Sequence, residues 1–318
     1  MTYYPPYLGS QVMIPRFESF LLSWNAIVLV FAFVMLSAAL GLVVDLQLAG
    51  LSRWLEKGGH LREKHHEIAG HFIGVVGVIY AVLVAFVVVT AWQTNDRDKD
   101  LTMQEQHTVD DLFHLDYAFH NSEGHGIRLM LAGYANVMGE EWKEMKRGDQ
   151  LCLDTTESCP PSSSKPSQAA NRLAHCIRDA TFDLIPTTSQ QQVVYEQGIQ
   201  LVQHFSESRE ERRRRYQERA LQGALWFSFF LGAVIFVLMT YFVEGQSRVL
   251  HAIRTSGFFA MIGMLVALAF IFDRPFVGAS QISGDEWGVL RAHFLQDMPP
   301  LTAADEIVAG EGLATCKE

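Results

Sequence analysis

Long runs of uncharged apolar residues dominate the pattern of hydrophobic and polar positions in this chain. Four windows contain no Asp, Glu, Lys or Arg, at residues 20–44, 68–92, 220–243 and 255–272. A helix of about 20 apolar residues crosses a bilayer core roughly 30 Å thick. The first three windows exceed that length, and Arg254 and Arg274 extend the fourth because their long side chains snorkel to the interface. We therefore predict four transmembrane helices. The first is too long for the apolar part of a signal peptide, so it is predicted to be retained.

The polar segment between the second and third windows has the spacing of amphipathic helices. Apolar residues recur every three or four positions in the stretches 101–119, 127–145, 173–184 and 194–205. Pro186 ends the third stretch, and Thr188 or Ser189 is a candidate cap for the fourth. No strong strand alternation occurs. Because 93–100 contains no Pro or Gly, we expect the second window to continue into the first soluble helix.

These patterns predict an all-α membrane protein. Four transmembrane helices carry a helical water-facing domain that is inserted between the second and the third. The predicted parts are an N-terminal tail (1–19), a first transmembrane hairpin (20–92), a helical extramembrane domain (93–219), a second transmembrane hairpin (220–272) and a C-terminal tail (273–318).

The second window has two distinct faces. One is a stripe of small residues, which are Gly70, Gly74, Gly77, Ala81 and Ala85. Small residues let helices approach closely in lipid, where no hydrophobic drive pairs them. The stripe therefore packs inside the four-helix bundle or, alternatively, between subunits or beside a pore. The other face is apolar and is a candidate hydrophobic gate, with Phe72, Val76, Ile79 and Leu83 as the candidate pore-lining residues.

Charge gives a prediction for topology. The chain has 25 Lys+Arg and 35 Asp+Glu, a formal net charge of −10, which argues against nucleic-acid binding. The short loops 45–67 and 244–254 are basic, so the positive-inside rule places both in the cytoplasm and the 93–219 domain outside it. The arginine-rich run 212–219 argues for the opposite orientation, although acidic residues dilute it. We expect a multi-pass protein of the cell (inner) membrane with an extracytoplasmic domain.

Sequence motifs for catalysis or metal binding are not found. Cys152 and Cys159 lie in a polar loop as a candidate disulfide, with two free thiols as the alternative. The histidines of His66-Glu67-Ile-Ala-Gly-His71 are one residue too far apart for H-E-x-x-H. There is no phosphate-binding loop, no dinucleotide fingerprint and no nucleophile elbow. We expect no cofactor, no metal site and no enzymatic activity.

An ionisable pair, Asp273-Arg274, closes the fourth window before Pro275. Ionisable residues at a membrane edge are functional candidates by default. The alternative is an interfacial helix stop held by an ion pair within the protein. A negative charge is unfavourable at a helix C-terminus, so Asp273 is expected to find a cation, a backbone N–H or water. Arg97 and Arg219 are the expected cations.

Several segments together resemble one family. They are Glu67-x-Ala-Gly-His-Phe-x-Gly-x-x-Gly-Val-x-Tyr80-Ala-Val-x-x-Ala-Phe86, the pair Glu141-Trp142, the arginine-rich run before the third window, and Phe272-Asp273-Arg274-Pro275-Phe276-x-Gly278. Over roughly residues 25–285 the chain resembles the bestrophin-like domain family of bacterial membrane proteins. Asp273, Arg274, Pro275, Phe276 and Gly278 look like its signature. The resemblance implies kinship with bestrophins, which are pentameric anion channels.

Two functions remain open from the sequence. The first is an oligomeric, bestrophin-like ion channel or pore, which predicts a homo-oligomer in the lipid bilayer that passes small inorganic ions. The second is a membrane sensor or accessory scaffold without transport activity, which acts through a partner protein. Oligomeric state and ion flux distinguish the two.

Overall fold

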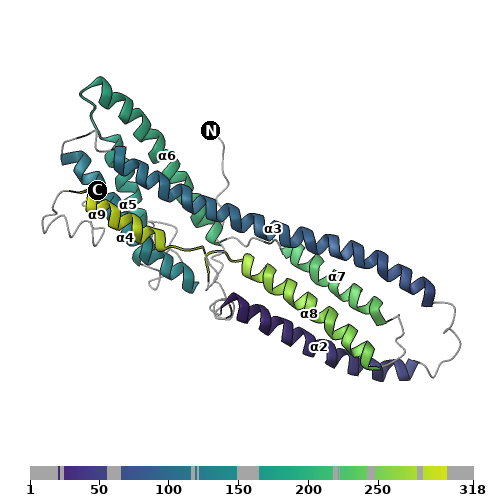
Figure 1. Cartoon of the computed structure of the whole chain (residues 1–318). Helices are drawn as coiled ribbons and strands as arrows, with labels where there is room; N and C mark the ends of the chain where they lie inside the picture. Colours follow the sequence, from purple (N-terminus) through teal and green to yellow (C-terminus); the bar gives the residue numbers. More distant parts are fainter. Residues whose placement is uncertain are drawn as a thin grey trace. The chain divides into compact units, whose positions relative to one another are not determined.

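The computed structural model describes residues 21, 25–55, 66–115, 119, 122–148, 165–217, 221, 223–241, 248–277 and 282–298. These residues are helical apart from turns and connections, and no strand occurs among them. The helices, labelled in Figure 1, are α2 (Ala26–Leu55), α3 (His66–Leu115), α4 (Ser122–Arg147), α5 (Lys165–Phe182), α6 (Ser189–Gln217), α7 (Gly223–Tyr241), α8 (Arg248–Phe272) and α9 (Asp285–Asp297). The all-α prediction is confirmed.

Among the described residues, three helices are long and apolar enough to cross a membrane. The apolar segments are Ala26–Gln47 in α2, Gly74–Leu115 in α3 and Ala252–Phe272 in α8. The remaining predicted span corresponds to α7, whose described apolar part, Gly223–Val237, is shorter. Because α3 runs without a break to Leu115, the expected continuation of the second window into the first soluble helix is confirmed.

The chain divides into two compact units. One, here the apolar unit, consists of Trp24–Asp96 and Arg219–Pro275. The other, here the polar unit, consists of Met1–Ser23, Arg97–Glu218 and Phe276–Glu318. The polar unit is therefore built from three separate stretches of sequence, and the last of them lies in what the sequence predicts to be a C-terminal tail.

In the apolar unit, glycines bring helices together. α2 and α8 lie side by side (Figure 1), and a Cβ added at Gly41 would lie 3.0 Å from the Phe259 side chain. A Cβ at Gly263 would collide with Ser37. On the other side of α8, an apolar cluster joins α3, α7 and α8 through Tyr80, Val84, Val87, Ala91, Leu221, Phe229, Ala233, Phe236 and Ala269. Such close packing of helix backbones is expected in a membrane, because lipid tails are as apolar as the side chains and give no hydrophobic drive for helices to associate.

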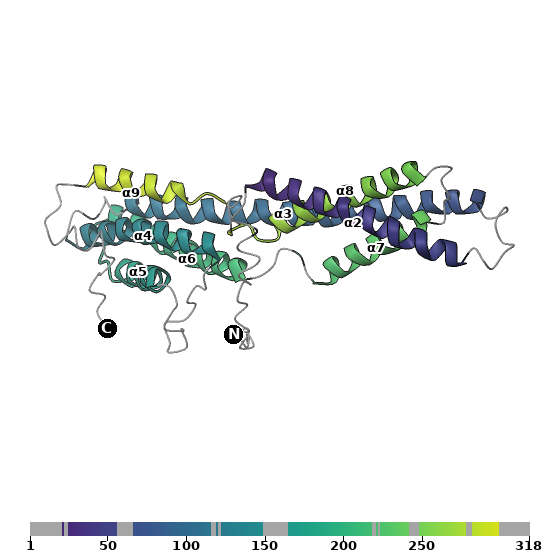
Figure 2. The same ribbon diagram turned by 90° about the horizontal axis from the view of Figure 1, so that it is seen from below.

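The polar unit has a core of its own. In it α4 packs against both α5 and α9 (Figure 2), and α5 packs against α6. The fourth soluble helix begins as expected, because the Thr188 hydroxyl accepts a hydrogen bond from the Gln191 N–H at 3.1 Å. The helix α9 was not predicted. Its Trp287 and Phe294 are fully buried, and Trp142 of α4 donates its indole N–H to the Ile282 carbonyl at 3.0 Å just before α9 begins.

Candidate functional site

The candidate gate residues of α3 lie at the edge of its packed face. Val76 and Leu83 are partly buried against the apolar cluster, whereas Ile79 is 64% exposed. The side chain of Phe72 lies outside the described residues. The predicted face therefore borders two environments, the packed interior of the apolar unit on one side and surface that this protomer leaves uncovered on the other.

Among the described residues, little of the protomer covers the small stripe of α3. Gly77 alone of its described glycines meets a neighbour, because a Cβ there would lie 3.2 Å from the Phe236 ring. Nothing in the described part of the chain lies within 4 Å of a Cβ at Gly74, and Ala81 and Ala85 are exposed. The surroundings of Gly70 lie outside what the structure describes. The tightest glycine contact with α3 comes from α7, where a Cβ at Gly232 would approach Tyr80 to 2.7 Å.

Asp273 ties the end of α8 to the start of α7. Its carboxylate is 2% exposed and accepts a hydrogen bond at 2.7 Å from the Leu221 N–H, two residues before α7 begins. A carboxylate near a helix N-terminus also has a favourable interaction with the helix dipole. A backbone N–H is thus one of the partners expected for Asp273. Arg97, which was an expected cation, forms an ion pair with Glu211 at 3.2 Å.

The rest of the signature is also buried. Arg274 is 3% exposed and Pro275 is buried at the end of the apolar unit. Phe276 begins the last part of the polar unit, where its ring lies 6.0 Å from Trp142 and 6.3 Å from Tyr216, both edge to face. Gly278 lies outside the described residues, as do Cys152 and Cys159. Cys176 of α5 is disulfide-bonded, and its partner also lies outside the described residues.

The polar unit contains a buried network of charges that the sequence analysis did not identify. The members are Glu105 of α3, Tyr134 and Glu141 of α4, Asn171 of α5, and Arg209 and Arg212 of α6. The side chains of the two arginines and two glutamates are at most 4% exposed. Two positive and two negative charges balance, which is the condition for keeping ions away from water.

Arg212 is the centre of the network. Its Nε donates to Glu105 Oε2 at 2.5 Å and a terminal nitrogen donates to Glu105 Oε1 at 3.3 Å, a two-point contact. The other terminal nitrogen lies 3.4 Å from Glu141 Oε1. Its guanidinium also stands over the Trp142 ring, 5.2 Å from the centroid. Burial lowers the pKa of Arg212, but Glu105 and Glu141 outweigh it, so the net pKa is raised and the group stays charged.

Arg209 is connected to Glu105 through the Tyr134 hydroxyl. It donates to the Tyr134 hydroxyl at 2.6 Å, and that hydroxyl donates in turn to Glu105. It also donates to the Asn171 side-chain oxygen at 2.7 Å, which brings in α5. Burial raises the pKa of Tyr134 well above its usual value, so the phenol keeps the proton that it donates. One hydrogen-bonded set thus links four helices of the polar unit.

The sequence contains a weak signal for this network. Arg209 and Arg212 are three residues apart, so they share a helix face, while the exposed Glu210 and Arg214 point elsewhere. The partner Glu105, however, is 107 residues away from Arg212. Tyr134 has the spacing of an apolar stripe, which conceals its hydroxyl. Only the fold brings these groups together.

Comparison with known proteins identifies the family. A model of the bestrophin-like domain matches residues 38–286, most of the chain. The chain belongs to the bestrophin-like family. No curated protein matches it. The family assignment makes this chain an integral membrane protein and confirms the resemblance seen in the sequence.

Solved structures share the bestrophin-like fold. A bacterial bestrophin homologue from Klebsiella pneumoniae, solved as a point variant, has a TM-score of 0.60 at 12% identity and covers 82% of this chain and 99% of its own. A second variant of that homologue has a TM-score of 0.61 at 12% identity, with coverages of 83% and 98%. A structure described as a membrane protein has a TM-score of 0.61 at 11% identity. At these identities the likeness concerns the fold alone.

Proposed function

We propose that this bestrophin-like protein is an oligomeric ion channel with four transmembrane spans, in which α3 borders the conduction path. The observation that carries the proposal is the family match over residues 38–286. Bestrophins are channels rather than enzymes, and the solved relatives share the fold over nearly their whole length. In this proposal α7 is the remaining span, and the water-facing helices are inserted between α3 and α7.

Oligomerisation is supported by the surface that α3 leaves uncovered. Gly74, Ala81 and Ala85 are small and exposed in the described part of the protomer, so a helix of a neighbouring subunit can approach them closely. The edge formed by Val76, Ile79 and Leu83 is apolar, and an apolar constriction blocks ions by excluding water. We propose that this edge is a hydrophobic gate and that the small stripe packs between subunits.

We propose an extracytoplasmic orientation for the 93–219 domain. The basic short loops favour it. The arginine-rich run opposes it less than the sequence suggests, because Arg212 is engaged with buried glutamates rather than with lipid headgroups. The disulfide at Cys176 suits an oxidising compartment.

Labelling of Gln200→Cys, an exposed position on α6, in intact cells tests the orientation, with Lys57→Cys in a basic loop as the opposite marker. If Gln200→Cys is labelled only after the membrane is ruptured, the domain lies in the cytoplasm and the proposed orientation is wrong.

Ion flux from proteoliposomes tests the channel. Ile79→Thr and Val78→Thr form a matched pair, because the two side chains are equally exposed in the protomer, 64% and 65%, but differ in direction around α3. A more polar gate wets more readily, so Ile79→Thr is expected to raise flux severalfold while Val78→Thr leaves it unchanged. Equal effects of the two variants remove the gate assignment. A wild-type protein that passes no ion, and that is monomeric by native mass spectrometry, supports the sensor or scaffold function instead.

A further inference from the structure

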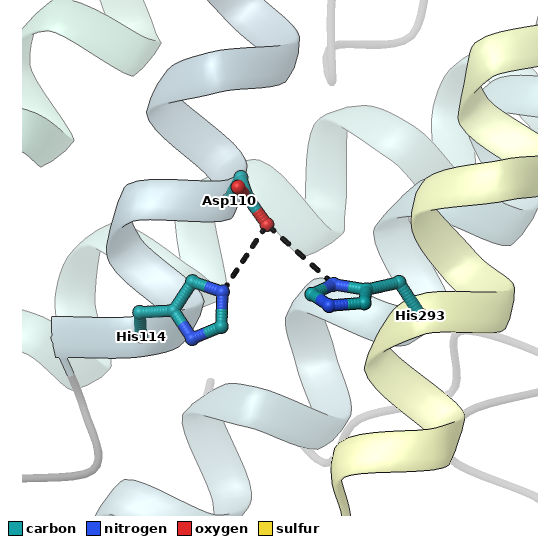
Figure 3. A group of neighbouring side chains, drawn as sticks. All are labelled: Asp110, His114 and His293. Atoms are coloured by element: carbon teal, nitrogen blue, oxygen red, sulfur yellow. Dashed lines mark ion pairs between the residues drawn. The ribbon is translucent and has the colours of Figure 1, made fainter.

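Two histidines and one aspartate converge in the polar unit, at a place that the channel proposal does not use. Asp110 and His114 lie one turn apart on α3, and His293 comes from α9 (Figure 3). Asp110 Oδ1 lies 3.6 Å from His114 Nε2 and 3.9 Å from His293 Nδ1. One ligand atom of each residue lies within 4.8 Å of the others. The three side chains are between one third and one half exposed, so an ion from solvent can reach them.

The distances are those of ligands around an ion rather than of direct hydrogen bonds. Both imidazole nitrogens lie beyond hydrogen-bonding distance of Asp110 Oδ1, and that oxygen is buried and accepts no hydrogen bond among the described residues. Zinc binds imidazole nitrogen and carboxylate oxygen at about 2.0–2.2 Å, which sets tetrahedral ligand atoms about 3.4 Å apart. The two distances from Asp110 Oδ1 to the imidazole nitrogens, 3.6 and 3.9 Å, need to shorten by only a few tenths of an ångström, and small rotations of the two partly exposed imidazoles bring their ligand atoms together from the separation of at most 4.8 Å.

The surroundings hold the two helices in the required register. Phe113 and Phe294, the immediate neighbours of His114 and His293, are fully buried and stack with ring centroids 4.0 Å apart and planes 9° apart. This stack fixes α9 against α3 beside the three ligands. Rigid support from packed neighbours is what keeps a metal site in its productive geometry.

A second carboxylate, that of Asp297, lies next to the ring of His293. Asp297, one turn after His293 on α9, has its Oδ2 3.6 Å from His293 Nε2, while Nδ1 of the same ring faces Asp110. Metal-binding histidines commonly give their other ring nitrogen to a carboxylate, which fixes the tautomer and raises the basicity of the ligand. The ring of His293 has this arrangement, with one nitrogen toward the three-residue cluster and the other toward an acid.

We propose that Asp110, His114 and His293 bind one divalent transition metal, with zinc the best fit, and that Asp297 is a positioning residue for His293. Two imidazoles with one carboxylate suit zinc, whereas magnesium and calcium prefer oxygen ligands. Three protein ligands leave a coordination position for water or another small ligand. Bound metal joins α9 to α3 and so holds the C-terminal part of the polar unit in place. The sequence predicted no metal site because His114 and His293 are far apart in the chain.

Zinc titration of the full-length protein in detergent, after removal of metals with chelator, tests the proposal. One zinc per protomer is expected, with no comparable binding of magnesium. His114→Gln and His293→Gln are expected to abolish this binding. His107→Gln is the matched control, because His107 is an exposed histidine on the same helix as His114, and it is expected to bind as the wild type does. Asp297→Asn is expected to weaken binding roughly tenfold to a hundredfold, as loss of an outer partner does.

Hydrogen exchange provides an independent readout. Zinc is expected to slow amide exchange in α9 in the wild type and in His107→Gln but not in His293→Gln. The variants change partly exposed side chains, so their metal-free melting temperatures serve to check that each is folded. Zinc affinity that is unchanged in both His114→Gln and His293→Gln overturns the proposal, and so does zinc binding that leaves exchange in α9 unaltered.

Discussion

Replacement of Glu105 by Gln is the most direct perturbation of the buried charge network. The change keeps the size of the side chain but removes one of the two negative charges that balance Arg209 and Arg212. Arg212 then loses a two-point contact with distances of 2.5 and 3.3 Å and keeps only Glu141 at 3.4 Å. The new amide also turns an N–H group toward the guanidinium, where both groups are donors. An uncompensated positive charge is left in a site closed to water.

The expected loss is large for a single substitution. Removal of one partner from a buried ion pair costs about 3–5 kcal/mol, because the other charge remains buried. For a domain of about 150–250 residues each kcal/mol lowers the melting temperature by about 2–4 °C, so the melting temperature should fall by roughly 6–20 °C. Circular dichroism of the detergent-solubilised protein measures this fall, at a fixed scan rate because unfolding is often irreversible in such proteins.

Glu140→Gln is the matched control for this change. Glu140 precedes Glu141 on α4, but its side chain is 56% exposed and pairs with Lys143 at 2.6 Å. Exposed ion pairs contribute about 0–1 kcal/mol, so the melting temperature should change by at most a few degrees. Equal melting temperatures for the Glu105 and Glu140 variants would refute the conclusion that the network is a closed, dehydrated site.

Three further predictions concern helix contacts and helix ends. Gly232→Leu should prevent folding of the apolar unit, whereas Gly74→Leu should leave the protomer folded and reduce oligomer formation, as size-exclusion chromatography with light scattering measures. Asp273→Ala should cost about 1–3 kcal/mol by leaving the Leu221 N–H without its acceptor, while Asp273→Asn, which keeps an acceptor oxygen, should melt closer to the wild type. Thr188→Ala should cost about 1 kcal/mol and increase hydrogen exchange in the first turn of α6.

Local patterns predicted most of the helices. The spacing of apolar residues gave α4, α5 and α6, and the lack of helix breakers in 93–100 gave the continuous α3. The cap at Thr188 was predictable because it depends only on residues within one turn. Such features depend only on residues that are near one another in the sequence, so they can be predicted from a single sequence.

The missed features all depend on distant parts of the chain. The helix α9 is short, and only its contacts with α3 and α4 show that Trp287 and Phe294 are core residues. The arginines before α7 suggested a membrane boundary, because a run of positive charge gives no indication that two of its members are buried. The small stripe of α3 illustrates the same limit, since periodicity marks a face but does not say whether Gly74 meets its own chain or another.

The buried network explains why the polar unit adopts one packing of its helices rather than several. Apolar side chains tolerate small shifts between helices, but the paired groups here do not. A shift of one residue along α6 rotates its face by about 100°, which would turn Arg209 and Arg212 away and leave Glu105 and Glu141 buried without partners. Each unpaired buried charge would cost several kcal/mol of folding free energy, which disfavours wrong registers of α6 against α3 and α4. The intact network itself adds only modestly to the free energy of unfolding, because burying its charges is costly. We infer that the network contributes to the uniqueness of the fold by penalising these wrong registers.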